Sequence, residues 1–386
     1  MAENKEKKVL NVPNLRFPEF EGEWEEHYLS DYLDFKNGLN PKPERFGKGI
    51  RFISVMDILN NAVITNDCIR ASVDVSEEEL LSFCVENGDI LFQRSSETLE
   101  DVGRANVYMD NKPAVFGGFV IRGKKKAEYD PLFFRYLLAS PFARKKIIPM
   151  GAGAQHFNIG QESLNKVKLH FALLDEQKKI ARLLSLLDER IAIQNKIIEK
   201  LQSLIKGIAQ HWIKNITSRS IYVKLGDICQ ITTGKLDANA QVDNGIYPFF
   251  TCAEHPFKID SFAFDTEALL ISGNGANLGY INYYNGKFNA YQRTYVLDLF
   301  SENIQYIKWV LKVLLPKRIT IEKSSSNTPY ILLSTLSDLM LPIPSKENQY
   351  HIAELMQSLE RKLSSQITLN GSYNILKQYL LRQMFI

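Results

Sequence analysis

The chain has 386 residues, of which 45% are hydrophobic and 11% aromatic, so it is long enough for two ordinary domains and is not disordered as a whole. Its 47 basic and 44 acidic side chains leave a formal charge of +3, which neither indicates nor excludes a nucleic-acid partner. The four cysteines lie far apart without a Cys-x-x-Cys pair, and this spacing predicts reduced thiols rather than a zinc site or a disulfide framework.

The N-terminus is polar, and no signal-peptide core follows it. No apolar run approaches the roughly 18 residues that a membrane span needs. We therefore expect a soluble cytoplasmic protein with no membrane partner.

The first globular segment covers residues 1–172 and indicates a mixed α/β domain. Leu29–Gly38 predicts a short helical or strand start that ends in a glycine turn. Asn87–Arg94 predicts a turn followed by a buried strand, and Ala114–Ile121 predicts another strand. Pro131–Ala143 is rich in apolar residues and predicts a short helix.

A helical spacer is predicted at residues 173–214, with one helix from about Asp175, a plausible N-cap, to Ile213. Its apolar residues alternate spacings of three and four, which is typical of a coiled-coil seam, and Gln194 is the single polar member. Such a helix is roughly 55 Å long at about 1.5 Å per residue. The seam consists of Ile180, Leu184, Leu187, Ile191, Gln194, Ile198, Leu201, Ile205, Ile208 and Trp212.

The second globular segment, residues 215–344, echoes the first. Its matching stretches are, in order, Leu225–Gly234, Thr266–Ser272, Ala290–Leu297 and Ile304–Leu315. The halves differ most in their loops, at residues 40–49 against 237–245 and at 94–104 against 273–280. A common frame that carries divergent loops is expected of two related sites with different targets.

A second spacer, residues 345–386, repeats the first at a constant offset, which pairs Gln177 with Gln349 and Gln194 with Gln366. Ser345 is the expected N-cap. Asn370-Gly-Ser372 interrupts the seam and predicts a bend or a weak turn, because glycine lowers helix propensity by about 1 kcal/mol.

These elements predict an α+β fold, with two globular mixed α/β domains joined by two long antiparallel coiled-coil helices and internal pseudo-two-fold symmetry. Antiparallel pairing would bring Gln194 opposite Gln366, because each lies near the middle of its helix. A buried polar pair of this kind weakens a seam but sets its register. The alternative is that these are two unrelated, tolerated glutamines.

No catalytic motif is found. Asn327-Thr-Pro-Tyr330 is similar to the Asn-Pro-Pro-Tyr motif of adenine-N6 methyltransferases but lacks its second proline, and no methyl-donor loop accompanies it. Gly273–Gly279 has the wrong spacing for a dinucleotide fingerprint and is interpreted as a loop. There is no phosphate-binding loop of the ATPase type and no nucleophile elbow. The chain is therefore expected to lack an active site and a metal site.

The motif order closely resembles that of the specificity subunit of type I restriction-modification enzymes, over essentially the whole chain. The matching stretches are Trp24–Gly38, Gly88-Asp-Ile-Leu-Phe92, Gln155-His-Phe-Asn-Ile159, Leu174-Asp-Glu-Gln-Lys-Lys-Ile-Ala-Arg-Leu-Leu184 and its repeat Lys346-Glu-Asn-Gln-Tyr-His-Ile-Ala-Glu-Leu-Met356. The repeat departs from the family at Glu347-Asn-Gln349, where glutamate and glutamine are usually adjacent.

The resemblance implies that residues 1–172 and 215–344 are target-recognition domains, each binding one half of a split double-stranded DNA target. It also implies two modification (methyltransferase) subunits as partners, with restriction (endonuclease and translocase) subunits added for ATP-dependent cleavage. S-adenosylmethionine, ATP and Mg would then be bound by those partner subunits, and this chain would need no cofactor.

DNA-contacting side chains are expected on loops, with Arg or Lys for guanine, Asn or Gln for adenine and basic groups for phosphates. The base-contact candidates are Arg94, Ser95, Ser96 and Arg104 in the first half and Asn274, Asn277, Gln292 and Arg293 in the second. The phosphate candidates are Lys42, Arg45, Lys48, Lys317, Arg318 and Lys323. For each of them a solvated surface role is the alternative.

Two other functions stay open at this point. The chain could be a self-contained DNA-binding or protein-docking factor, although it has no helix-turn-helix and no strongly basic domain. It could also be an adenine methyltransferase itself. Co-purification with a methyltransferase and calorimetry with S-adenosylmethionine would separate these hypotheses.

Overall fold

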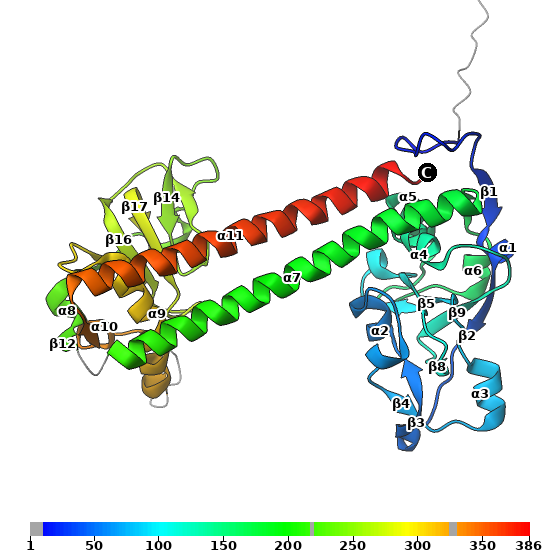
Figure 1. Cartoon of the computed structure of the whole chain (residues 1–386), viewed down its shortest axis with the longest axis horizontal. Helices are drawn as coiled ribbons and strands as arrows, with labels where there is room; N and C mark the ends of the chain where they lie inside the picture. The colour runs from blue at the N-terminus through cyan, green and yellow to red at the C-terminus, as the bar shows by residue number, and fades with distance from the viewer. Residues whose placement is uncertain (1–10, 217–219, 324–329) are drawn as a thin grey trace, which may run out of the picture. The chain divides into compact units, whose positions relative to one another are not determined.

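The computed structural model describes residues 11–216, 220–323 and 330–386. It divides into two compact units, Met1–Asn195 with Leu369–Ile386 (the first unit) and Lys196–Thr368 (the second unit). The two long helices, α7 (Leu174–Ile216) and α11 (Lys346–Gln383), each contribute a part to both units (Figure 1). The predicted α+β fold with a duplicated mixed domain and long helices is confirmed.

The globular part of the first unit is built on two small sheets. The four-stranded sheet has the order β2 (Leu33–Asn37), β9 (Val120–Lys125), β5 (Ile90–Gln93) and β7 (Ala105–Val107), and is antiparallel throughout. The three-stranded sheet has the order β4 (Ser72–Val73), β3 (Phe46–Ile53) and β8 (Ala114–Phe116), in which β3 and β8 are parallel. The helices are α1 (Leu29–Tyr32), α2 (Val55–Asn60), α3 (Glu77–Phe83), α4 (Pro131–Ala139), α5 (Pro141–Ile147) and α6 (Gln161–Asn165).

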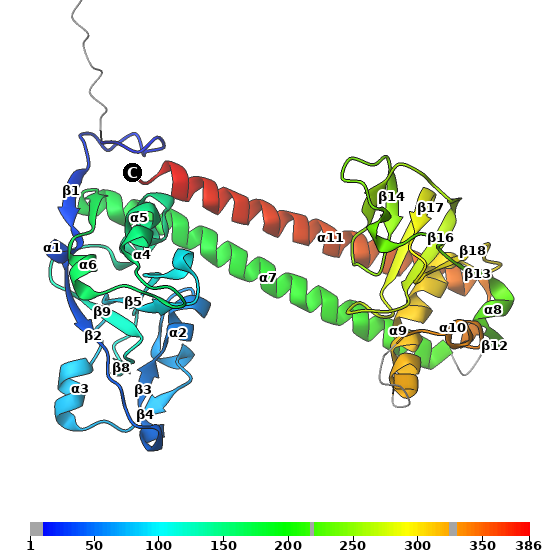
Figure 2. The same ribbon diagram turned by 180° about the vertical axis from the view of Figure 1, so that it is seen from behind.

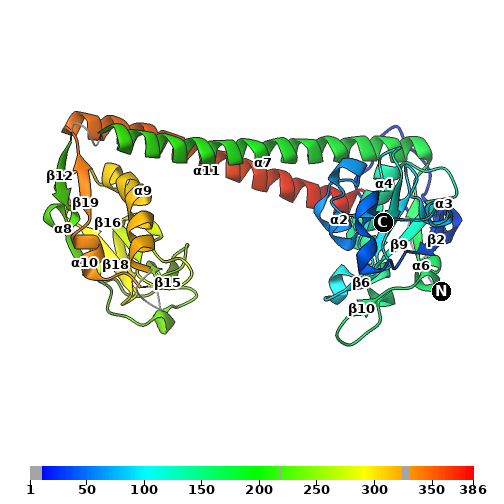
Figure 3. The ribbon, with the colours of Figure 1, turned by 90° about the horizontal axis from the view of Figure 1, so that it is seen from below.

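Two further strand pairs complete the first unit. The strand β1 (Glu25–Tyr28) pairs antiparallel with β11 (Lys168–Phe171), immediately before α7. The short strands β6 (Ser95–Ser96) and β10 (Phe157–Asn158) also pair, at the end of this unit that lies away from α7 (Figure 3).

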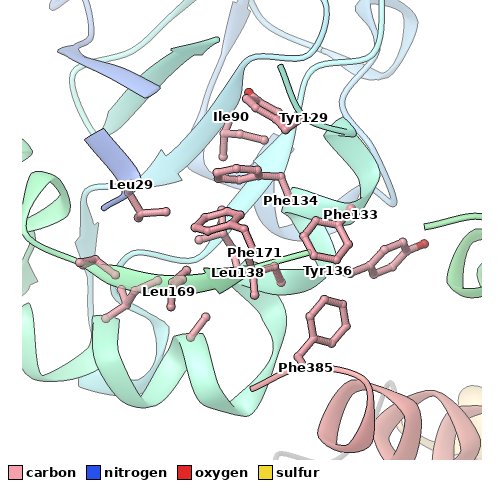
Figure 4. Close-up of a cluster of buried hydrophobic side chains, with 14 of the residues drawn as sticks. Leu29, Ile90, Tyr129, Phe133, Phe134, Tyr136, Leu138, Leu169, Phe171 and Phe385 are labelled. Atoms are coloured by element: carbon pink, nitrogen blue, oxygen red, sulfur yellow. The ribbon is translucent and has the colours of Figure 1, made fainter. Parts of the chain in front are cut away.

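The largest core of the first unit joins α4 to the long helices. Phe133 and Phe134 are fully buried, and the Phe133 ring lies 5.5 Å from that of Phe385, which follows α11 (Figure 4). Ile180 and Leu184 of α7 belong to the same cluster. Burial of aromatic and aliphatic side chains at this junction fixes the globular part on the helix pair.

The second unit has one six-stranded sheet with the order β13, β18, β16, β17, β14 and β15 (Figure 2). It is antiparallel except for the β14–β17 pair. The strand β12 (Ile221–Lys224) pairs with β19 (Met340–Ile343), as β1 does with β11. The other bounds are β13 Gln230–Thr233, β14 Tyr247–Phe250, β15 Phe257–Ile259, β16 Phe264–Ser272, β17 Ile281–Ala290, β18 Thr294–Asp298, α8 Leu225–Ile228, α9 Ile304–Lys323 and α10 Leu333–Ser337.

The long helices follow the predicted seam, and all ten of its residues on α7 are buried or half-buried. In the first unit Asp188 of α7 pairs with Lys377 of α11 at 2.5 Å. Asn195, seven residues after Asp188, accepts a hydrogen bond from Asn370, seven residues before Lys377. The two helices therefore run antiparallel in this unit. The Gln194–Gln366 contact stays a prediction, because the two glutamines belong to different units.

Three local expectations need correction. α7 begins at Leu174, so Asp175 lies in its first turn and is not the N-cap. α11 is helical through residues 370–372, so no turn interrupts it there, and Asn370 still donates a hydrogen bond to Asn195 of α7. Ala114–Ile121 is not one strand, since a tight turn at residues 117–119 separates β8 from β9. The N-cap at Ser345 is confirmed, because its Oγ accepts from the Asn348 N–H at 3.4 Å.

Candidate nucleic-acid interface

Backbone hydrogen bonds gather the candidate residues of the first unit into one frame, the first loop frame, which consists of residues 93–96, 103–104, 117–119 and 158–159. The Arg94 N–H donates to Phe119 O at 2.9 Å, and Arg94 O accepts from the Ile159 N–H at 2.9 Å. The Gln93 N–H donates to Arg104 O at 2.7 Å. Because the buried strand β5 ends at Gln93, the polar residues Arg94 and Ser95 that follow it are only half-buried.

The side chains of the first loop frame differ in their freedom to contact a ligand. Arg94 is half-buried and its Nη1 donates to Gly118 O at 3.2 Å, while Ser95 Oγ donates to the Asn158 amide oxygen. Ser96 is buried, and its Oγ accepts from the Thr98 N–H at 3.2 Å, which is a loop-shaping role. Sequence reasoning missed Phe119, which is 68% exposed beside Gly118; an exposed aromatic in a glycine turn is the signal that identifies it.

The second unit repeats this frame bond for bond. The Gly273 N–H donates to Arg293 O at 2.8 Å, the Ser272 N–H to Tyr280 O at 3.0 Å and the Ile331 N–H to Gly273 O at 2.9 Å. The second loop frame therefore consists of residues 272–274, 279–280, 291–293 and 330–331. The sequence pairing of loop 94–104 with loop 273–280 agrees with these bonds.

Matching bonds also show which candidates are equivalent. Gly273 takes the place of Arg94, Arg293 that of Phe119 and Tyr280 that of Arg104. Asn274 forms an antiparallel β-bridge with Tyr330, and this bridge is equivalent to the antiparallel pairing of Ser95 with Asn158. The hydrogen bond from the Val120 N–H to Gly117 O, which closes a turn, recurs as a bond from the Thr294 N–H to Tyr291 O. Val120 is thus equivalent to Thr294, and the sequence alignment that paired Ala114 with Ala290 is wrong by two residues. The two frames therefore carry their arginines at different positions.

In the second loop frame Gln292 and Arg293 are exposed, and Asn274 is half-buried. Asn277 is less available, since its Nδ2 donates to Cys252 O at 3.1 Å. Tyr280 was missed by sequence reasoning; it is exposed and its hydroxyl donates to Glu254 at 3.4 Å. Of the methyltransferase-like motif, residues 327–329 lie outside the described residues.

The phosphate candidates of the first unit already have acidic neighbours. The Arg45 guanidinium donates two hydrogen bonds to the Glu79 carboxylate, and its Nε donates to Asp74 O at 2.7 Å. The Arg45 guanidinium lowers the pKa of Glu79 to about 2. Lys48 lies 2.9 Å from Asp74, whereas Lys42 is exposed with no hydrogen bond from its side chain to the described residues. These pairs order the loop before β3, so Lys42 is the most available cation of the three.

In the second unit the phosphate candidates lie near the end of α9. Lys317 is exposed, and Arg318 pairs with Glu322 at 2.7 Å. Ile319 of this turn lies against Gly279 of the second loop frame, as Ile147 lies against Gly103 in the first unit. The basic run thus borders the loop frame. Lys323 ends α9, and its side chain lies outside the described part of the chain.

A carboxylate on each long helix holds the globular part in place. Asp188 accepts from the Tyr136 hydroxyl at 2.8 Å and pairs with Lys377. Glu360, at the equivalent position of the repeat, accepts from Lys308 at 2.7 Å and from Lys312 at 2.9 Å. We refer to these contacts as the carboxylate clamps. Burial favours a higher pKa for Glu360, but the ammonium groups of its two lysine partners outweigh burial and lower the pKa.

Equivalent glutamines add a second link between helix and globular part. Gln177 Oε1 accepts from the Asp130 N–H at 3.0 Å, at the start of α4. Gln349 Oε1 accepts from the Asn303 N–H at 3.0 Å, at the start of α9. Asp130 and Asn303 in turn cap their helices with their own side chains. Gln177 and Gln349 therefore link each long helix to the start of a helix in the globular part.

Within residues 11–216, 220–323 and 330–386, no group of three or more His, Cys, Asp or Glu side chains is arranged to hold a metal ion. In the same ranges, no helix combines the length and the apolar character that crossing a membrane requires.

The model of the type I restriction modification DNA specificity domain family matches residues 21–203 and 220–370. The chain belongs to this family, and each of the two matches contains one loop frame and part of one long helix. Its relatives in this family are named as specificity subunits of type I restriction enzymes.

Among its relatives, the EcoDI specificity subunit of Escherichia coli is 43% identical over 143 residues, which are 37% of this chain and 32% of that protein. The putative MjaX specificity subunit of Methanocaldococcus jannaschii is 27% identical over 206 residues, 52% of this chain and 48% of that protein. The matched stretches span less than half of the length of these two relatives.

The fold is similar to that of the type I restriction-modification S subunit from M. genitalium, with a TM-score of 0.66, 19% identity and coverage of 97% of this chain and 99% of that chain. A chain solved in work on complex assembly and conformational transition of the type I R-M system gives a TM-score of 0.57 at 16% identity, over 93% of this chain and 96% of that chain. These likenesses extend over both units.

Proposed function

We propose that this chain is the DNA sequence-recognition subunit of a type I restriction-modification complex and is itself non-catalytic. It would bind a split double-stranded DNA target and dock two adenine-methyltransferase (modification) subunits, with restriction subunits added for ATP-dependent cleavage. S-adenosylmethionine, ATP and Mg would be held by those partners. The complex would act in the cytoplasm.

The repeated loop frame is the observation that carries this proposal. The same backbone bonds recur in both units, while the side chains that they position differ. Arg94 and Ser95 of one frame correspond to Gly273 and Asn274 of the other, and Arg293 replaces Phe119. Since arginine suits guanine and Asn or Gln suits adenine in the major groove, two such frames would bind half-sites of different sequence.

Partner docking is supported by apolar side chains on the outer faces of the long helices. Isolated exposed apolar residues are ordinary on any surface, but a series of them at helical spacing fits an apolar partner helix. In the first unit these residues are Leu183, Leu186, Ile193, Ile375, Leu376 and Tyr379, and in the second unit Ile197, Leu204, Leu355 and Ile367. A helix of a modification subunit is the proposed occupant in each unit.

Co-expression with the modification subunit tests the proposal. We expect a stable complex that methylates adenine in one split DNA sequence, which mapping of methylated adenines in cellular DNA will show. Replacing the loop 273–280 should change one half of that sequence and leave the other half unchanged, with the loop 94–104 as the matched exchange in the other unit.

Two outcomes contradict the proposal. The first is a chain that stays alone and still binds one DNA sequence tightly, which would favour a self-contained DNA-binding factor. The second is clear calorimetric binding of S-adenosylmethionine to the isolated chain, which would favour a methyltransferase.

A further inference from the structure

A single exposed phenylalanine stands at the tip of the first loop frame. Residues 114–123 are all buried except Phe119, whose side chain is 68% exposed. Phe119 lies in the turn before β9, which the bond from the Val120 N–H to Gly117 O closes at 2.8 Å. An isolated exposed apolar side chain is ordinary on a protein surface, but this one is held rigidly, at a position where the second unit has an arginine.

The backbone around Phe119 is fixed from two sides. Phe119 O accepts from the Arg94 N–H at 2.9 Å, and Arg94 Nη1 donates to Gly118 O at 3.2 Å. A side chain at Gly118 would overlap that of Asn40, so only glycine fits there. The phenyl ring is therefore presented at one place. Arg94 leads directly into β6, at the end of the first unit that lies away from α7 (Figure 3).

The second unit presents an arginine in the same way. The bond from the Arg94 N–H to Phe119 O recurs as the bond from the Gly273 N–H to Arg293 O at 2.8 Å. Arg293 is exposed, like Phe119. Because the same backbone bonds hold both turns, residues 119 and 293 should face the DNA of their own half-sites in the same manner. An arginine at such a tip suits the edge of a guanine in the major groove.

The chemistry of a phenyl ring limits what Phe119 can contact on DNA. The ring cannot make the hydrogen bonds by which guanidinium and amide groups distinguish base edges. The apolar group that the four bases offer in the major groove is the C5-methyl group of thymine, and phenylalanine is among the side chains that contact it. The Arg94 guanidinium, next to the turn, adds positive charge that suits the phosphates flanking the base.

We propose that Phe119 contacts the C5-methyl group of a thymine in the half-site of the first unit and determines the specificity at that base pair. This inference rests on the proposed function and adds to it the kind of base that one residue selects. The contact removes both the ring and the methyl group from water, which stabilises the complex. One exchange of side chain at the tip of the frame, phenylalanine for arginine, would thus exchange thymine for guanine.

Replacing thymidine by deoxyuridine tests the contact, because uracil lacks only the methyl group. The probe is a duplex with the split sequence that mapping of methylated adenines identifies, in which each thymine of either strand is replaced singly. Exchange of the loop 273–280 shows which half-site belongs to the second unit. Competition binding uses the complex with the modification subunits. At one position of the first unit's half-site, we expect uracil to weaken binding by the unmodified complex about fourfold, the ratio for one buried methyl group.

Three variants complete the test. In Phe119→Ala, binding of the thymine duplex should weaken about tenfold, and the same uracil should have no further effect. Phe119→Leu keeps an apolar side chain and should keep part of the uracil effect. Leu81→Ala is the matched control, because Leu81 of α3 is 85% exposed and lies outside the loop frame; it should keep the full effect. Thermal unfolding checks that each variant folds.

Two results overturn the proposal. The first is an equal effect of uracil on the unmodified and Phe119→Ala complexes at every position. The second is a loss of binding in Phe119→Ala that is the same for all DNA sequences, which would indicate a wedge between base steps. In both cases a complex that still methylates adenine in a split sequence leaves the proposed function standing. A complex that binds no split sequence contradicts the proposed function itself, and this inference with it.

Discussion

Replacing Glu360 by glutamine tests the carboxylate clamp of the second unit. The side chain of Lys308 is 8% exposed and that of Glu360 30%, so the variant would leave a nearly buried ammonium group without its counter-charge. Removing one partner of a fully buried pair costs about 3–5 kcal/mol, and an exposed pair contributes about 0–1 kcal/mol. The intermediate exposure of Glu360 places the expected loss of unfolding free energy at about 2 kcal/mol.

Urea denaturation followed by tryptophan fluorescence measures this loss, because two of the three tryptophans, Trp212 and Trp309, belong to the second unit and the Trp309 ring lies 4.4 Å from the Lys312 ammonium. Glu354→Gln is the matched control on the same helix, since Glu354 is exposed and accepts a hydrogen bond from the exposed Tyr350 hydroxyl at 3.2 Å; its expected effect is below about 0.5 kcal/mol. A loss in Glu360→Gln no larger than in this control would refute the clamp.

Three further changes have defined outcomes. Asp188→Asn should lower the unfolding free energy by about 1–3 kcal/mol, because Tyr136 and Lys377 lose a charged acceptor, and urea denaturation of the same kind checks it. Replacing Gln194 and Gln366 together by leucine should raise the melting temperature if they face each other in the seam, and a clear decrease would argue for another role. Arg94→Ala in the methyltransferase complex should weaken DNA binding by about 1–3 kcal/mol and relax only one half-site, and an equal loss for all sequences would mean a phosphate contact instead.

The repeat and the long helices could be predicted because they follow local rules. Apolar spacing of three and four residues determines which face of α7 is buried, and the constant offset of the repeat carries the same pattern into α11. The predicted divergence of the loops within a shared frame also agrees with the structure, since the backbone bonds around Arg94 and Gly273 are the same.

The carboxylate clamps escaped sequence reasoning although Asp188 and Glu360 occupy equivalent positions of the repeat. Charged residues beside a seam usually lie on a solvated face, so the sequence does not single out these two carboxylates. Their cations, among them Lys308, come from a globular segment far away in the sequence, so only the folded chain shows the pairing. For the same reason the sequence could not show that Arg45 and Lys48 already have Glu79 and Asp74 as partners.

The strand pairs at the base of each globular part have a consequence for inheritance. The strands β1 and β11 are four residues each, and they bring the point where the chain enters this part next to the point where it leaves. The strands β12 and β19 do the same in the second unit. A recombination event with both crossovers inside such a pair would replace everything between them and leave the long helices intact. If the chain acts as we propose, such an exchange would supply a new DNA specificity in one genetic step and leave unchanged the helix surfaces that we propose for partner docking.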